Sequence, residues 1–220
     1  MEIVLASRNK KKITEMQALL TELCNTEIKI LSLDDIGYTG DIEEDGESFE
    51  ENAVIKASVP AKMGYFGISD DSGLAVDYLN GAPGIYSARY SGEGATDEKN
   101  NEKLMGEMNG VTERGAAYVS VIAFVAPEDK FTFPHSEKYS DYASMKNGSS
   151  LKAATFRGEC RGELLDHYRG NGGFGYDPMF LVHEYERTFA EITQEEKNKI
   201  SHRGKALRAF AAWLNENMEK

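Results

Sequence analysis

Along most of the chain, short apolar segments alternate with segments whose apolar residues recur at helical spacing. Residues 2–6 form a short apolar run that is typical of a buried strand. A helical spacing follows at Ile13, Met16, Leu19, Leu20 and Leu23. The sequence therefore predicts that the chain begins with a strand, a tight loop and a helix.

The same alternation continues through the middle of the chain. Further strands are predicted at residues 27–31, 65–69 and 116–125. Ser48 and Thr96 are suitable N-caps for two further helices, of which the first ends or bends at Pro60 and the second covers residues 97–108. Because crossover helices must cover the faces of a sheet, the alternation predicts an α/β fold with a mixed β-sheet.

The pattern changes in the last third of the chain. Residues 128–152 are rich in Ser, Lys, Tyr and Asn and have little apolar periodicity, which predicts a surface insertion. Residues 155–165 resemble a pair of strands that turns near Gly158 or Gly162, and a glycine-rich loop follows at residues 170–178. A final helix is predicted from Ser201, with an apolar stripe at Leu207, Phe210, Ala211 and Leu214.

Composition narrows the class of protein. A chain of 220 residues with 40% hydrophobic residues favours one large domain, residues 1–220, or two lobes of it. The net charge of −12 argues against a nucleic-acid polymer as partner. No apolar run has the roughly 20 residues that a membrane span needs, and no secretory leader is visible, so we expect a cytoplasmic protein without a membrane partner. Cys24 and Cys160 are expected to be buried, reduced thiols.

Positive charge lies at the beginning of two predicted helices, where acidic residues are normally favoured. Arg8 and residues 10–12 precede or begin the first helix, and His202 and Arg203 begin the last one. An anion bound at such a helix start would meet backbone donors, the helix dipole and cationic side chains together. Phosphate binding is thus one interpretation, and solvated surface lysines are the other. No P-loop is present, because residues 7–12 contain no glycine.

Adjacent carboxylates suggest a metal site. Asp70 and Asp71 follow a predicted strand, where successive side chains point to opposite faces, so they should have different tasks. A carboxylate at a strand end can hold Mg²⁺, which takes few protein ligands, and the acidic loop at residues 43–45 offers a second ligand. A purely structural turn at residues 70–73 is the alternative.

Two further groups could form a nucleotide pocket. Asn52 and Lys56 share a face of their predicted helix, next to the acidic loop. The segment at residues 172–177 combines glycines, which allow close approach to a ligand, with aromatic rings for stacking, and Asp177 could accept from a base N–H. His202 with Arg203 could donate to a purine carbonyl or to phosphate. An exposed helix face and a tight β-turn are the structural alternatives.

Together these residues resemble the inosine triphosphate pyrophosphatase family, whose members hydrolyse ITP, dITP and XTP. The matching motifs are residues 7–12, 43–53, 69–74, 81–89, 174–178 and 201–203. They lie in order and cover almost the whole chain. The resemblance implies an elongated mixed β-sheet flanked by helices, two lobes with a nucleotide cleft between them, and a homodimer.

The resemblance also implies roles for individual residues. Asp71 and Glu44 would hold Mg²⁺, and Asp71, with Asp70, would orient or deprotonate the attacking water. Lys56 would add charge beside them. The nucleotide-binding residues that it implies are Ser7, Asn9, Lys12, Asn52, Ser72, Phe174, Gly175, Tyr176, Asp177, Lys197, His202 and Arg203.

Two other functions remain open from sequence. The same phosphate and metal apparatus could serve dUTP or a modified nucleotide, because it does not contact the base. A regulator that binds purine triphosphates without hydrolysing them would need no metal carboxylate, whereas Asp70, Asp71 and Glu44 are all present.

Overall fold

The computed structural model describes residues 1–127, 129–133 and 151–218. Within them the strands are β1 (Glu2–Leu5), β2 (Lys29–Leu31), β3 (Phe66–Val76), β4 (Gly115–Pro127), β5 (Leu151–Leu164), β6 (Phe180–Val182) and β7 (Arg187–Thr188). The α-helices are α1 (Lys10–Leu23), α2 (Phe49–Lys62), α3 (Asp97–Glu107), α4 (Gln194–Ile200) and α5 (His202–Met218), and 3-10 helices cover Gly84–Arg89 and Asp177–Met179.

These strands form a mixed sheet, as predicted. For the part of the chain that is described, it has seven strands in the order β2-β1-β3-β4-β5-β6-β7. Strand β1 pairs in parallel with both β2 and β3, whereas β6 pairs antiparallel with β5 and with β7. Parallel pairs require crossover connections, and α1 and α2 supply them.

The chain divides into two compact units. Unit 1 comprises residues 1–71, 121–157 and 206–220, and unit 2 comprises residues 72–120 and 158–205. Strands β3, β4 and β5 and helix α5 each have residues in both units. The nucleotide cleft that was expected between two lobes stays a prediction.

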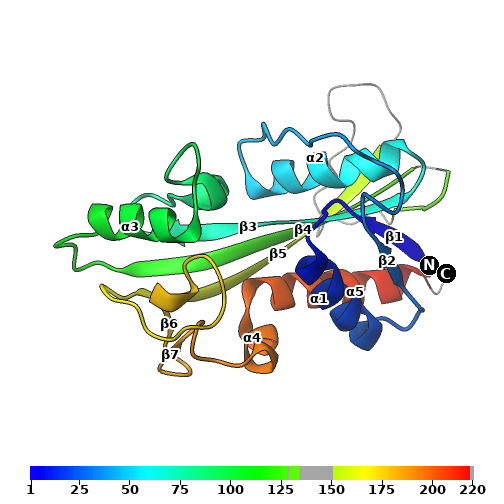
Figure 1. The fold of residues 1–220 in the computed structure, drawn as a ribbon. Helices are drawn as coiled ribbons and strands as arrows, with labels where there is room; N and C mark the ends of the chain where they lie inside the picture. Colours follow the sequence, from blue (N-terminus) through cyan, green and yellow to red (C-terminus); the bar gives the residue numbers. More distant parts are fainter. Residues whose placement is uncertain (128, 134–150, 219–220) are drawn as a thin grey trace. The chain divides into compact units, whose positions relative to one another are not determined.

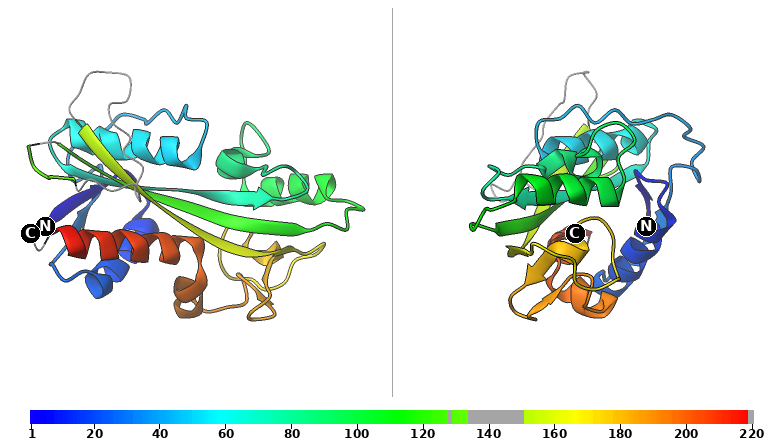
Figure 2. Two further views of the ribbon diagram at one scale, coloured as in Figure 1. Left: turned by 180° about the vertical axis from the view of Figure 1, so that it is seen from behind. Right: turned by 60° about the vertical axis from the view of Figure 1, so that its left-hand side comes forward.

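Unit 1 has helices on both faces of its part of the sheet, with α2 on one face and α1 and α5 on the other (Figures 1 and 2). Its core is rich in aromatic rings, and Trp213, 1% exposed, packs against Phe124, Phe131, Phe156 and Phe210. The apolar stripe predicted for the last helix is confirmed, because its members are buried in this core.

Part of the predicted surface insertion belongs to unit 1's core. Phe131 and Phe133 are 9% and 8% exposed and pack on the aromatic cluster. Leu151 and Lys152 are the first residues of β5, so the insertion is shorter than predicted at its end. Residues 128 and 134–150 lie outside the described residues.

Unit 2 has a separate core. Helix α3, drawn in green in Figure 1, covers one face of its strands and contributes Leu104 to this core, and Met108, which follows the helix, packs there as well. The Tyr118 ring from β4 contacts the rings of Phe180 and Phe189, with centroid distances of 4.8 and 5.5 Å, and those two rings also contact each other at 5.0 Å. This aromatic group also contacts His202 and the Lys197 ammonium.

Several local predictions were wrong. Strand β3 runs without a break through Asp70–Gly73, so the two aspartates lie within a strand and not at its end or in a turn. Strand β5 is one strand of 14 residues and does not turn at Gly158 or Gly162. Helix α2 continues past Pro60 to Lys62, so of the two alternatives predicted for Pro60, an end of the helix at this residue is wrong. Cys24 is only partly buried, whereas Cys160 is buried as predicted, and neither forms a disulfide.

Candidate functional site

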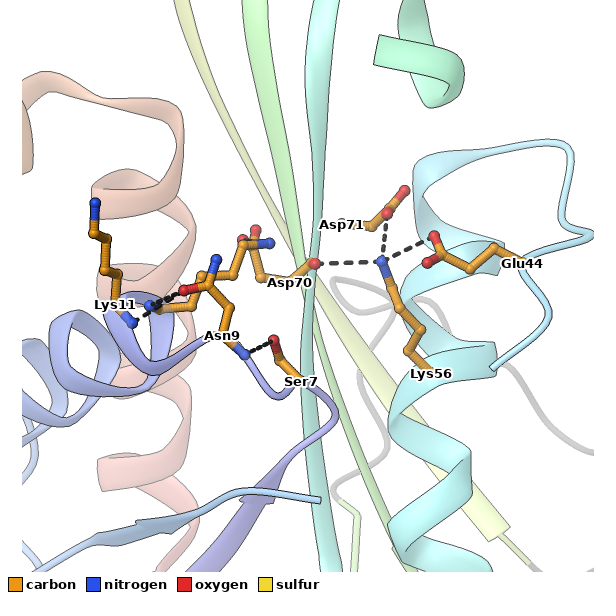
Figure 3. Close-up of polar contacts among 8 residues, drawn as sticks. Ser7, Asn9, Lys11, Glu44, Lys56, Asp70 and Asp71 are labelled. Atoms are coloured by element: carbon orange, nitrogen blue, oxygen red, sulfur yellow. Dashed lines mark hydrogen bonds and ion pairs between the residues drawn. The ribbon is translucent and has the colours of Figure 1, made fainter. Parts of the chain in front are cut away.

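The loop after β1 and the start of α1 form the first part of a polar group in unit 1 (Figure 3). Asn9 is the N-cap of α1, and its Oδ1 accepts from the backbone N–H groups of Lys11 and Lys12 at 3.0 and 3.4 Å. The Oγ atom of Ser7 accepts from the Asn9 N–H at 3.1 Å. No acidic residue lies in the first turn of α1, so its cations and helix dipole leave this end positive.

Asp70 and Asp71 point to opposite sides of β3, as their strand position requires (Figure 3). On one side, Asp70 Oδ2 lies 3.2 Å from the Lys12 ammonium. On the other, Asp71 Oδ1 lies 2.5 Å from the Lys56 ammonium. Each carboxylate is therefore paired with a cation from a different helix, α1 or α2, and the prediction that the two side chains point to opposite faces is confirmed.

Lys56 is at the centre of the second pair. Its ammonium also donates to Glu44 Oε2 at 3.1 Å and to the Asp70 carbonyl oxygen at 3.4 Å. Burial alone would lower the pKa of Lys56, but the nearby Asp71, Glu44 and Asp70 raise it above its usual value. The lysine therefore carries its charge although it is buried.

Burial has the opposite effect on the aspartate. It raises the pKa of Asp71 to about 6 even though Lys56 acts to lower it, and the negative charges of Glu44 and Asp70 raise it further. An additional cation would stabilise the ionised form of such a buried carboxylate more than that of an exposed one. Such perturbed groups are concentrated at functional sites.

The same residues fit a divalent metal ion with few protein ligands. Asp71 Oδ2 is buried and has no hydrogen-bond partner among the described residues. Glu44 forms an ion pair with the same lysine, Lys56, that Asp71 contacts. Within that part of the chain, no group of three or more His, Cys, Asp or Glu side chains is arranged to hold a metal. Two carboxylates suit Mg²⁺, which completes its shell with water and phosphate oxygens. Of the two loop glutamates, Glu44 contacts this cluster and Glu43 is exposed.

Backbone contacts hold the acidic loop in place. Asn52, fully buried on α2, accepts from the Gly46 N–H at 2.9 Å, and Glu51 accepts from the Glu47 N–H at 2.7 Å. Arg8 donates to the Tyr38 and Gly40 carbonyls at 3.0 and 2.8 Å and pairs with Asp34. Asn52 and Arg8 thus hold the loop that carries Glu44, contacts that their residue types alone did not predict.

A second polar group lies in unit 2, around the glycine-rich loop. Asp177 is 1% exposed, and its Oδ2 accepts from the Lys197 ammonium at 2.6 Å and from the Phe174 N–H at 3.0 Å. Gly173 leaves the room that this requires, because a Cβ atom there would lie 2.2 Å from Asp177 Oδ2. The Lys197 ammonium lies 4.8 Å from the ring centroids of both Phe174 and Phe189.

The two aromatic residues of this loop differ in their exposure to solvent. The Phe174 side chain is 59% exposed and is available for stacking. Tyr176 is 3% exposed, packs in unit 2's core and donates its hydroxyl to the Ser87 carbonyl oxygen at 2.8 Å. Tyr176 therefore supports the loop in this structure, and Phe174 is the ring that a base could meet.

Helix α5 begins with two buried residues whose side chains can donate hydrogen bonds. His202 and Arg203 are 5% and 7% exposed. The His202 ring stacks on Tyr118 at a centroid distance of 4.8 Å and an interplanar angle of 11°. Burial, together with the nearby Asp177 carboxylate, raises the pKa of Tyr118 well above its usual value. Tyr118 carries no sequence signal, because within a buried strand an aromatic residue is expected in the core.

Comparison with known proteins identifies the family. A profile of the Ham1 family matches residues 3–213. The dITP/XTP pyrophosphatase of Geobacter sulfurreducens is 47% identical over 208 residues, which cover 93% of this chain and 92% of that protein. The dITP/XTP pyrophosphatase of Desulfotalea psychrophila is 43% identical over 226 residues, with 99% and 90% covered.

Solved structures agree with this assignment. The Ham1 protein of Staphylococcus aureus has a TM-score of 0.81 and 37% identity, and the match covers 100% of both chains. A HAM1 protein from Coxiella burnetii also has a TM-score of 0.81, with 38% identity over 98% of this chain and 99% of that one. The resemblance predicted from the motifs is confirmed, and the chain belongs to the Ham1 family.

Proposed function

We propose that this protein hydrolyses the non-standard purine nucleoside triphosphates ITP, dITP and XTP to the monophosphate and pyrophosphate, with Mg²⁺ as cofactor. The observation that carries the proposal is the buried Asp71, paired with Lys56 beside Glu44 and with one carboxylate oxygen free of partners in the described structure. The names of the two relatives above, both dITP/XTP pyrophosphatases, support the substrate class.

The group in unit 1 binds the triphosphate and assists the chemistry. Lys12, Lys56 and the N-terminus of α1 offset phosphate charge, with Ser7 and Asn9 orienting the loop. Asp71, with Asp70, orients the attacking water and accepts its proton. The water oxygen bonds to the α-phosphorus, the bond from that phosphorus to the bridging oxygen breaks, and pyrophosphate leaves. When bound by Asp71 and Glu44, Mg²⁺ supplies charge neutralisation for the phosphate oxygens.

The group in unit 2 binds the nucleoside. Phe174 offers an exposed ring for stacking, and Lys197, His202 and Arg203 supply donors for a 6-keto oxygen. Adenine has an amino group at that position, so donors there select against it. Asp177 accepts from Lys197 and from the Phe174 N–H, and the Tyr176 hydroxyl fixes the loop to the Ser87 carbonyl. Ser72 and Gly175 are further nucleotide-binding residues of this group.

Product analysis with a nucleotide panel tests this function. The purified protein is incubated with ITP, dITP, XTP, GTP, ATP and dUTP in the presence of Mg²⁺, and pyrophosphate and orthophosphate are measured separately. We expect pyrophosphate as the direct product and the highest kcat/KM with the first three nucleotides. Orthophosphate as the direct product contradicts cleavage at the α-phosphorus, and preferred turnover of dUTP contradicts the base assignment. Binding of ITP without turnover identifies a nucleotide sensor instead.

Two further expectations belong to this proposal. A homodimer, implied by the family resemblance, is checked by light scattering of the eluting protein, and fractionation of the source cells checks the cytoplasmic location. Among the described helices, none has both the length and the apolarity needed to cross a bilayer.

A further inference from the structure

Two side chains of helix α3, in unit 2, bind the backbone N–H and C=O groups of Gly175 in the glycine-rich loop. The Oδ2 atom of Asp97 accepts from the Gly175 N–H at 2.7 Å. One helical turn later, Asn101 Nδ2 donates to the Gly175 carbonyl oxygen at 3.0 Å. Because residues four apart share a helix face, these two side chains grip Gly175 from the same side.

Gly175 lies at a bend of the glycine-rich loop, so contacts to it fix the direction of the chain on both sides. It has φ +59°, the left-handed region in which side chains are disfavoured, so the chain changes direction there. The exposed Phe174 precedes it, and the buried Tyr176 and Asp177 follow. A displacement of Gly175 would therefore move the Phe174 ring relative to the Lys197 ammonium that it contacts.

Burial of Asn101 leaves one of its polar atoms unsatisfied. It is 6% exposed, and its Oδ1 has no hydrogen-bond partner among the described residues. A buried, unsatisfied polar atom lowers stability, so the amide is not explained by folding alone. Its neighbour Asn100 makes a similar link elsewhere, donating to the Ser87 and Ala88 carbonyls at 3.3 and 3.2 Å. Helix α3 thus holds two segments of unit 2 through amide side chains.

We propose that Asp97 and Asn101 are positioning residues that set the base-binding loop, and through it the preference for 6-keto purines. This inference rests on the proposed function. Neither side chain needs to touch the nucleotide, because both act through the Gly175 peptide groups and hence on the Phe174 ring. The residues proposed for the triphosphate and the metal belong to unit 1, so a role confined to this loop should leave triphosphate binding unchanged.

Steady-state kinetics of four variants tests the proposal. For Asn101→Ala, and to a smaller extent for Asp97→Ala, we expect the KM for ITP to rise, by about tenfold for loss of the buried hydrogen bond, with kcat within about twofold of the unchanged protein. Asp97→Asn should retain a KM near that of the unchanged protein, because its amide oxygen still accepts from the Gly175 N–H. Glu102→Gln is the matched control, since Glu102 is exposed on the same helix and makes no hydrogen bond to this loop within the described residues.

Two more measurements separate positioning from a general structural defect. Inhibition by inorganic tripolyphosphate, which has no base, should be unchanged in Asn101→Ala and Asp97→Ala, whereas the ratio of kcat/KM for ITP to that for ATP, which has a 6-amino group, should fall. Thermal unfolding reports whether each variant is folded, and the exposed position of Asp97 keeps its variants folded if Asn101→Ala is not.

The outcomes distinguish the two proposals. If the unchanged protein releases no pyrophosphate from ITP, the proposed function fails. If it is active and both alanine variants keep its KM for ITP and its ITP-to-ATP ratio of kcat/KM, the positioning role is overturned. A loss confined to kcat, or weaker inhibition by tripolyphosphate, overturns it as well.

Discussion

At Asp71, burial and an ion pair act in opposite directions on one carboxyl group. Burial raises its pKa to about 6, and the Lys56 ammonium at 2.5 Å acts to lower it. Its second oxygen has no partner in the described structure, so this atom is placed to act on a ligand. An amide of the same shape would lack both the charge and the ability to accept a proton.

Asp71→Asn should therefore reduce catalysis far more than nucleotide binding. We expect kcat for pyrophosphate release with Mg²⁺ to fall by about 10²–10⁴-fold, the usual contribution of a positioned base. Asp45→Asn, in the exposed part of the acidic loop, is the control and should remain active. Pyrophosphate release is measured by a coupled assay and ITP binding by calorimetry, and full activity of Asp71→Asn would remove Asp71 from the mechanism.

Glu43 and Glu44 form a matched pair for locating the metal ligand. The Glu44 side chain is 31% exposed and lies 3.1 Å from Lys56, whereas Glu43 is exposed to solvent. Glu44→Gln should raise the Mg²⁺ concentration needed for half-maximal activity by about tenfold, because one of two carboxylates is lost, and Glu43→Gln should leave it unchanged. Magnesium titrations of both variants at saturating ITP check this, and the reverse result would transfer the ligand to Glu43.

The two cysteines should react at different rates in the folded protein. Burial raises the pKa of both thiols, and Cys160 is 3% exposed while Cys24 is half-buried. Since the thiolate is the reactive form, a raised pKa lowers the rate at neutral pH, and the Cys24 rate should rise about tenfold per pH unit until its pKa is reached. Mass spectrometry after iodoacetamide treatment should find Cys24 modified first, with both modified in denaturant. Equal native rates would contradict the burial of Cys160.

Residue types and spacing predicted the charged members of the site but not the atoms that they contact. Two cation-rich helix starts and adjacent aspartates pointed to phosphate and metal chemistry, and the structure groups Lys12, Lys56, Asp70 and Asp71 in unit 1. The substrate contact predicted for Asn52 stays a prediction, and its amide oxygen also accepts from the Gly46 N–H. Sequence cannot distinguish these cases, because a polar side chain can serve either a ligand or a loop.

At the scale of elements, helices α1, α2, α3 and α5 and strands β1, β2 and β4 were predicted, whereas β3 and β5 were divided and α4, β6 and β7 were not predicted. Ser48 and Thr96 cap α2 and α3 as expected, since capping depends on local chemistry. Strands β3 and β5 were each divided in the prediction because Asp, Ser and Gly are typical of turns. Pairing with neighbouring strands overrides that preference, and burial of Asp70 and Asp71 is made possible by the lysines beside them.

Gly162 is a test of the long β5 strand. A Cβ atom at this position would lie 2.3 Å from the Leu181 carbonyl oxygen and 2.8 Å from the Phe180 ring, so Gly162→Ala should destabilise the protein by about 1–3 kcal/mol. Gly106→Ala is the matched control, because open space surrounds that position on α3 and alanine favours the helix by about 0.5–1 kcal/mol. Urea unfolding monitored by circular dichroism measures both. A neutral Gly162→Ala would contradict the close approach of β5 and β6.

On the scale of the whole molecule, the chain forms two cores that share their longest elements. The core of unit 1 contains Trp213, and the core of unit 2 contains Tyr118. Strands β3, β4 and β5 have residues in each, so neither core can lose its strands without affecting the backbone of the other. Length and composition favoured one large domain or two lobes of it, but they could not indicate which segments each core would contain, because both units are built from distant parts of the chain.

Shared strands predict that the two units unfold together, although a chain of 220 residues exceeds the size at which two-state behaviour is usual. Trp213, the single tryptophan, reports on unit 1, whereas Gly162→Ala perturbs unit 2. We expect Gly162→Ala to lower the urea midpoint of Trp213 fluorescence by the same amount as that of circular dichroism, and Gly106→Ala to raise both. If Gly162→Ala leaves the Trp213 midpoint unchanged while the dichroism transition splits in two, the units unfold independently, and the continuous strands do not couple them.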